Sequence, residues 1–194
     1  MTHYLEIAGT VVGLLYLYLE YKASIWLWLA GIVMPAIYVF VYYDAGFYAD
    51  MGINIYYLVA GVYGWVAWMT RRGTDGTALP VRRTPRRFIL PLAALSGLFF
   101  AVIAAILINF TDSDVPYGDS FTTALSIVGL WLLARKYLEQ WIVWIAVDAV
   151  CAGLYFYKEL YPTAALYLLY TVIAVAGYYK WKKMMTDETL SDAR

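Results

Sequence analysis

The sequence has little of what enzymes most often use for chemistry. His3 is the only histidine and Cys151 the only cysteine among 194 residues. These counts exclude an internal disulfide and a cysteine- or histidine-based metal cluster, and they remove the most common acid–base catalyst. No Gly-rich phosphate loop is present, so a nucleotide-driven pump is not expected. We therefore expect neither an enzyme nor a protein with a cofactor or bound metal.

Charge is also scarce. Only 14% of the residues are charged and the formal net charge is zero, so no basic field indicates nucleic acid as a partner. The chain is instead 63% hydrophobic, with a mean hydropathy of +0.64. A soluble domain of this length could not bury so much apolar surface, and we expect a polytopic protein with the lipid bilayer as its surroundings. No basic region precedes the first apolar run, so we expect no cleavable signal peptide.

Seven apolar segments predict seven transmembrane helices and an all-α fold. Their approximate ranges are 4–20, 25–43, 47–69, 88–110, 118–135, 139–157 and 162–181. Pro162 falls at the start of the seventh segment, where a missing backbone N–H does no harm. Asp119 is expected to cap the fifth segment, and Pro35 to kink the second.

The basic residues predict the orientation. Six arginines lie between the third and fourth segments, and cytoplasmic loops are enriched in Lys and Arg. With this linker inside, thirteen of the fourteen Lys and Arg residues fall on the cytoplasmic side, and Lys158 alone falls outside. We therefore expect an inner-membrane protein with its N-terminus outside and its C-terminus in the cytoplasm.

The sequence also matches itself. A shift of 116 residues aligns Ala8 through Trp65 with Ala124 through Trp181 without a gap, with sixteen identities in 58 pairs. Self-similarity at a fixed offset indicates an internal repeat. The first three segments thus match the last three, and the fourth connects two triplets that run in the same direction. We expect a first repeat over residues 1–69, a linker, connector helix and external loop over 70–117, and a second repeat with its tail over 118–194.

One polar face stands out. Trp141, Trp144 and Asp148 are spaced i, i+3 and i+7, so they share a face of the sixth helix. Asp148 lies nine residues past Glu139, about 13 Å into a hydrocarbon core of about 30 Å. An intramembrane carboxylate is costly and by default marks a functional site. The alternative is a protonated carboxyl, hydrogen-bonded to a neighbouring Tyr or Ser, with no role in transport.

Other polar side chains reach a similar depth. Asn54 lies in the third segment and Ser126 in the fifth, where Thr122 shares its face and Thr123 lies beside it. Each alone could hydrogen-bond between helices. Together with Asp148 they suit a flat aromatic cation, which gains from a tryptophan face and a carboxylate and offers hydroxyl groups to polar partners.

Three motifs resemble the Pnu-type bacterial vitamin transporters. They are Tyr63-Gly64-Trp65-Val66-Ala67-Trp68, Thr122-Thr123-Ala124-Leu125-Ser126 and Trp141-Ile142-Val143-Trp144. The resemblance implies a 3+1+3 arrangement like that of the SWEET carriers, and facilitated uptake of a phosphate-free vitamin, most often nicotinamide riboside, with trapping by a cytoplasmic kinase. It places the substrate between the repeats. The expected binding residues are Asn54, Tyr63, Trp65, Trp68, Thr123, Ser126, Trp141, Trp144 and Asp148.

Several alternatives stay open. The resemblance implies an asparagine in the riboside transporters at the position where this chain has Asp148, so a thiamine transporter of the same family is the second hypothesis. A SWEET-like sugar carrier would not require Asp148. Trp26, Trp28 and Trp181 are expected in an aromatic belt at the membrane interface, without a ligand. The sequence determines neither the oligomeric state, for which a homo-oligomer is one alternative, nor the coupling of transport to an ion.

Overall fold

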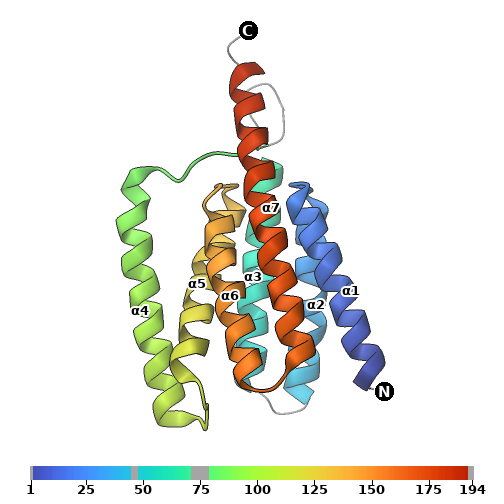
Figure 1. Cartoon of the computed structure of the whole chain (residues 1–194), viewed down its shortest axis with the longest axis vertical. Helices are drawn as coiled ribbons and strands as arrows, with labels where there is room; N and C mark the ends of the chain where they lie inside the picture. The colour runs from blue at the N-terminus through green and yellow to red at the C-terminus, as the bar shows by residue number, and fades with distance from the viewer. Residues whose placement is uncertain (1, 45–47, 71–78, 192–194) are drawn as a thin grey trace. The chain divides into compact units, whose positions relative to one another are not determined.

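The computed structural model describes residues 2–44, 48–70 and 79–191, which form seven α-helices (Figure 1). The all-α fold predicted from the sequence is confirmed, because each apolar segment contains one helix. Most helix ends lie within two residues of the expected ones, but the last helix runs ten residues further, to Ser191. The helices are α1 (Thr2–Tyr21), α2 (Trp26–Asp44), α3 (Tyr48–Thr70), α4 (Arg86–Phe110), α5 (Pro116–Ala134), α6 (Gln140–Tyr157) and α7 (Tyr161–Ser191).

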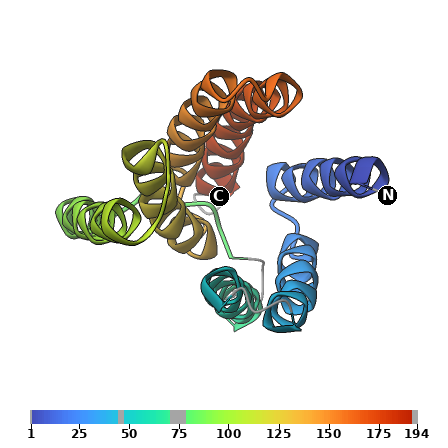
Figure 2. The same cartoon turned by 90° about the horizontal axis from the view of Figure 1, so that it is seen from below.

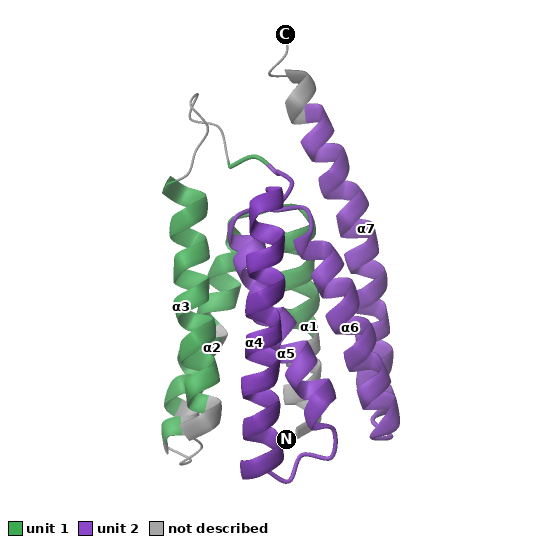
Figure 3. Cartoon of the chain, turned by 90° about the vertical axis from the view of Figure 1, so that its left-hand side faces the viewer, with its two compact units in different colours: residues 1–80 green, residues 81–194 purple. Residues whose placement is uncertain are grey.

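The chain divides into two compact units, residues 1–80 and 81–194 (Figure 3). The first contains α1 to α3 and the second contains α4 to α7, so the expected connector helix lies in the second unit. In each unit, helices that follow one another in sequence pack against one another. The second unit shows this order clearly, with α5 between α4 and α6 (Figure 2).

Among the described residues, three helices are long and apolar enough to cross a bilayer by themselves: α4, α6 and the first 27 residues of α7. Shorter apolar stretches lie in α1 and α2. In α4, Ala104 is buried, whereas Leu90 and Phe110 are 78% and 82% exposed. Such an apolar surface is stable only against lipid or another apolar partner, which agrees with the expected membrane location.

Three helices of the described chain end in the same left-handed turn. Ala23, Lys136 and Glu159 have φ angles of 50°, 53° and 59°. After α1, Ala23 N donates to Glu20 O and Ser24 N to Leu19 O. The same pair of bonds ends α5 and α6, and it is the Schellman cap that satisfies the last carbonyl groups of a helix. The three short turns make α1–α2, α5–α6 and α6–α7 antiparallel neighbours.

The α1–α2 turn and the α5–α6 turn correspond to each other at a shift of 113 residues. Five backbone hydrogen bonds of the first turn, from Lys22 N→Tyr18 O to Trp28 N→Ile25 O, recur in the second, from Arg135 N→Trp131 O to Trp141 N→Leu138 O. The cation–π contact of Lys22 with Tyr18 also recurs, as Arg135 over Trp131. The 116-residue shift taken from sequence identities is therefore wrong by three residues in these turns.

The helix pairs after these turns repeat the same packing. In the first unit Trp28 of α2 meets Trp68 of α3 edge to face, and a Cβ on Gly64 would lie only 2.3 Å from the Trp28 ring. In the second unit Trp141, Trp181 and Gly177 repeat this arrangement. All three positions are again 113 residues apart. A glycine at the contact allows an indole ring to lie against the backbone of the facing helix.

The segment before α4 is attached to the α5–α6 turn. Arg82 N donates to Lys136 O, and Leu138 N donates to Arg82 O. The Glu139 carboxylate accepts from both the backbone N–H and the hydroxyl of Thr84, at 2.7 and 2.8 Å. These four bonds hold residues 82–84 against the turn. The preceding residues 71–78, which include the expected cytoplasmic Arg71 and Arg72, lie outside the described residues.

The proline and cap expectations have mixed outcomes. Pro162 is the second residue of α7, as expected, and Pro35 lies inside α2. The Asp119 prediction is wrong: α5 already begins at Pro116, and the Asp119 carboxylate accepts a hydrogen bond from Ser113 at 3.1 Å. The fixed φ angle of proline favours a helix start, so α5 begins three residues before the acid.

Candidate functional site

Asp148 is buried in the middle of α6. It lies eight residues beyond Gln140, the first residue of the helix, or about 12 Å along the axis, and is 7% exposed. Trp144 precedes it by four residues on the same face, half-buried, with its indole N–H fully covered. The carboxyl group and the indole ring that were expected to share a face therefore do so.

Two tyrosines of α7 lie near this carboxyl group. Asp148 is close enough to Tyr167 and Tyr170 of α7 to interact with them electrostatically, and also to Cys151 one turn further along α6. The rings of Tyr155 and Tyr167 lie 5.1 Å apart, and those of Tyr167 and Tyr170 lie 5.5 Å apart. The cluster thus offers an acid near two phenol groups of α7, with Tyr155 of α6 next to one of them, from two helices that pack closely.

Helix α5 closes another side of the cluster. Thr122 is buried and its side chain lies close to that of Cys151, which connects α5 to the face of α6 that carries Asp148. Its hydroxyl also donates within α5, toward Gly118 O and Asp119 O, at 3.2 and 3.1 Å. Ser126 donates to Thr122 O at 2.7 Å, so its oxygen is left to accept from a ligand. Thr123, the third candidate on this helix, is half-buried.

Trp144 and Trp141 have different surroundings. Gly129 of α5 faces Trp144, and a Cβ there would lie 3.4 Å from its ring, so α5 approaches the indole closely. Trp141 is completely buried, with its ring centroid 5.6 Å from that of Trp181. Trp141 therefore holds α6 to α7, and Trp144 is the tryptophan beside the acid cluster.

The other candidates belong to the first unit. Asn54 is half-buried in α3, and Tyr63 and Trp65 are each 38% exposed. Trp68 is 5% exposed and lies against Trp28 at 5.6 Å. The structure thus gives Trp68 a packing role within its unit, and it brings only Trp141, Trp144 and Asp148 together on one helix face.

Two expectations about the aromatic belt are wrong. Trp28 and Trp181 are 1% and 0% exposed, each in a tryptophan pair, so neither faces lipid. Trp26, at 64% exposed, fits the belt. Sequence reasoning also missed the residues that complete the cluster: Thr122 as a contact of Cys151, and Cys151, Tyr155, Tyr167 and Tyr170. Their spacing of three or four residues within α6 and α7 was the available signal.

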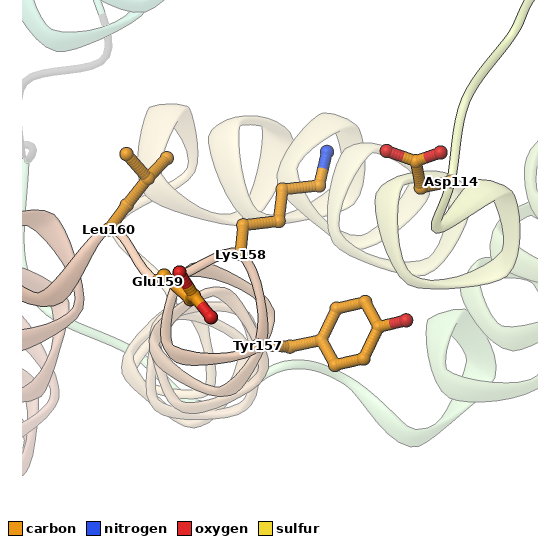
Figure 4. A pocket seen from close by; sticks show the side chains of 5 residues that line it. All are labelled: Asp114, Tyr157, Lys158, Glu159 and Leu160. Atoms are coloured by element: carbon orange, nitrogen blue, oxygen red, sulfur yellow. The ribbon is translucent and has the colours of Figure 1, made fainter.

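A separate hollow lies at the α6–α7 turn. It has a volume of about 650 Å³ and is lined by Asp114, Tyr157, Lys158, Glu159 and Leu160. Figure 4 shows the Lys158 side chain extending toward Asp114. Tyr157 is nine residues from Asp148, about 13 Å along α6, so this open hollow is not the acid cluster. Within the described residues, no group of three or more His, Cys, Asp or Glu side chains could hold a metal ion.

The chain matches the family model described as "Nicotinamide mononucleotide transporter" over residues 3–183. The chain belongs to this family of membrane transporters. The relation expected from the tryptophan and threonine motifs is thereby confirmed, and the family is one of transporters rather than enzymes.

Relatives and a solved structure support this assignment. The nicotinamide riboside transporter PnuC of Escherichia coli (strain K12) is 23% identical over 202 residues, which cover 92% of this chain and 84% of the relative. The riboflavin/roseoflavin transporter RibM of Streptomyces davaonensis is 26% identical, covering 91% and 83%. The crystal structure of the vitamin B3 transporter PnuC has a TM-score of 0.69 and 25% identity, covering 92% of this chain and 80% of that one.

Proposed function

We propose that this protein takes up nicotinamide riboside across the bacterial inner membrane by facilitated diffusion. The observation that carries the proposal is the buried Asp148, which shares a face with Trp144 and lies among tyrosines. The pyridinium ring of the riboside is a flat cation. It gains from an indole face by cation–π attraction and from a carboxylate as counter-ion. The riboside transporters among the relatives support the same substrate.

The charge of Asp148 also discriminates among the substrates that appear in the names of the family model and the relatives. The family model is named for the mononucleotide and one relative for riboflavin. A mononucleotide carries a phosphate, which a buried carboxylate repels. Riboflavin is neutral and gains nothing from a counter-ion. Thiamine is an aromatic cation and stays the second candidate, because the carboxylate favours it equally.

The membrane topology we propose has seven spans, with the N-terminus outside and the C-terminus inside. In the second unit the helix order brings the start of α4, the α5–α6 turn and the end of α7 to one end. All Lys and Arg residues described in this unit, except Lys158, belong to that end. Helix α7 is 31 residues long, about 46 Å, so its basic C-terminal part extends beyond a core of about 30 Å.

In this proposal the two triplets are parallel repeats that α4 connects in the sequence. The corresponding turns and tryptophan pairs at a shift of 113 residues support it, with α1 to α3 equivalent to α5 to α7. Under this shift Asp148 corresponds to Pro35. The acid therefore has no acidic counterpart in the first repeat, and the substrate is held asymmetrically.

Ligand binding to the purified protein tests the proposal. Calorimetry with nicotinamide riboside, thiamine, riboflavin and nicotinamide mononucleotide should give the lowest Kd for the riboside. Proteoliposomes without any ion gradient should equilibrate it, since passive transport needs no energy source and phosphorylation in the cytoplasm would retain it. If the Kd for thiamine is lower than that for the riboside, thiamine is the substrate. Uptake that requires a proton or sodium gradient would refute facilitated diffusion.

A further inference from the structure

Gln140 is a buried amide without a hydrogen-bond partner. It is the first residue of α6 and is 0% exposed, and neither its Nε2 nor its Oε1 has a partner. A buried polar group left unpaired destabilises a fold, so nearly all such groups in native proteins have partners. An amide in this position therefore points to a partner that is present only at some stage of the transport cycle.

Two indole groups next to it share this property. The Nε1 atoms of Trp141 and Trp144 are also buried and without a partner. On a helix of 3.6 residues per turn, positions 140, 141, 144 and 148 span about 100° of the circumference. Trp28, the counterpart of Trp141, has the same unpaired Nε1, so that atom of Trp141 follows from the repeated packing. Gln140 and Trp144 thus continue the face of Asp148 toward the start of α6, with two donor groups and one acceptor oxygen.

Packing does not require an amide at this position. The corresponding residue of the α1–α2 turn, at the shift of 113, is Leu27, which is also 0% exposed. A hydrocarbon side chain of similar size fills that position in the first unit. The amide of Gln140 is thus a chemical difference between two positions with matching backbone geometry.

We propose that Gln140 is a specificity-determining residue that hydrogen-bonds the uncharged polar part of the substrate. This inference rests on the proposed function. With the pyridinium ring beside Trp144 and Asp148, the ribose hydroxyl groups reach toward the start of α6, on the cytoplasmic side of the acid. The amide of Gln140 both donates to and accepts from vicinal hydroxyl groups, and the Trp144 indole N–H donates to one of their oxygen atoms. In this arrangement Asp148 favours substrates with a positive charge, and Gln140 favours substrates with a hydroxylated sugar.

The test combines stability with binding in Gln140→Leu, which copies Leu27. Without ligand, its Tm in detergent should equal or exceed that of the wild type, because a buried unpaired amide has been removed. The Kd for nicotinamide riboside should rise roughly tenfold, since one hydrogen-bonding group of the substrate loses its partner. Gln140→Met, of similar length and flexible, provides the same comparison if the branched leucine packs poorly. Leu27→Gln is the matched control and should lower the Tm of the free protein while leaving the Kd for the riboside unchanged.

The possible outcomes separate the two proposals. A wild type that does not bind the riboside refutes the proposed function and, with it, the role of Gln140. If the wild type binds and both Gln140 variants keep its Kd within twofold, the role of Gln140 is refuted and the proposed function stands. Lower Tm values for both variants without ligand would show that the amide has a partner within the protein, which also refutes the inference.

Discussion

Trp141 meets Trp181 edge to face, with ring centroids 5.6 Å apart and ring planes at 90°. Gly177 lies under the Trp141 ring, and a Cβ there would lie 2.6 Å from it. Gly177→Ala should therefore lower stability by about 1–3 kcal/mol, because extra atoms in a tight contact force the helices apart. Thermal unfolding in detergent measures this loss. Gly153→Ala, whose Cβ would meet nothing within 4 Å, is the control and should unfold like the wild type.

The attachment of residues 82–84 to the α5–α6 turn gives a second prediction. Glu139→Ala removes the acceptor of both Thr84 bonds, so this segment should open more readily. Hydrogen exchange of the Arg82 and Leu138 amides should become faster, since these groups take part in the bonds between the segment and the turn. Asp112→Ala, at an exposed position, should leave the exchange unchanged. Unaltered protection in Glu139→Ala would show that the carboxylate does not hold the segment.

The proposed orientation is testable by cysteine labelling. A cysteine at Gly76, within the arginine-rich linker, should not react with a membrane-impermeant reagent in intact cells and should react after lysis. Replacing Cys151 by serine removes the only native thiol. A cysteine at Ser113, in the loop between α4 and α5, should react in intact cells. The reverse pattern at these two positions would invert the topology.

Helix positions were predictable from the sequence because apolar runs, prolines and charged loops mark them independently of packing. The shift that relates the two repeats was not predictable in the same way. A shift of three residues turns a helix by only about 60°, so apolar residues still align on similar faces at 113 or 116. Identical Ala, Val, Leu and Gly residues in the two repeats then result from their shared apolar composition and do not determine the shift. The left-handed residues Ala23 and Lys136, which determine the register, share no side-chain chemistry.

The candidate site was predictable only in part. Trp144 and Asp148 were found because their spacing along one helix determines a common face. Tyr155, Tyr167 and Tyr170 were missed because their contacts depend on how α6 and α7 are rotated against each other, which the Trp141–Gly177 contact determines. The roles of Trp28 and Trp181 were wrong for the same reason: a tryptophan near a helix end suits a lipid interface or a tight helix pair equally.

The half-buried Trp144 and the exposed Trp26 give a further prediction. Trp144→Ala should raise the Kd for nicotinamide riboside at least tenfold, because a desolvated cation–π contact contributes about 2 kcal/mol. Trp26→Ala, at a 64% exposed position, should change it little. Calorimetry on both purified variants measures the difference. An equal loss of affinity in both variants would mean that binding depends on the overall stability of the bundle rather than on the Trp144 ring.

The central claim is that the Asp148 carboxylate binds a cationic ring, and Asp148→Asn tests it most directly. The change keeps the shape of the side chain and removes its charge. Calorimetry should show that the binding free energy of nicotinamide riboside falls by about 1–3 kcal/mol. Asp112→Asn, an exposed carboxylate on the loop after α4, should bind like the wild type. An unchanged Kd in a folded Asp148→Asn protein would contradict the account, because Asp148 would then be a buried acid without a role in binding.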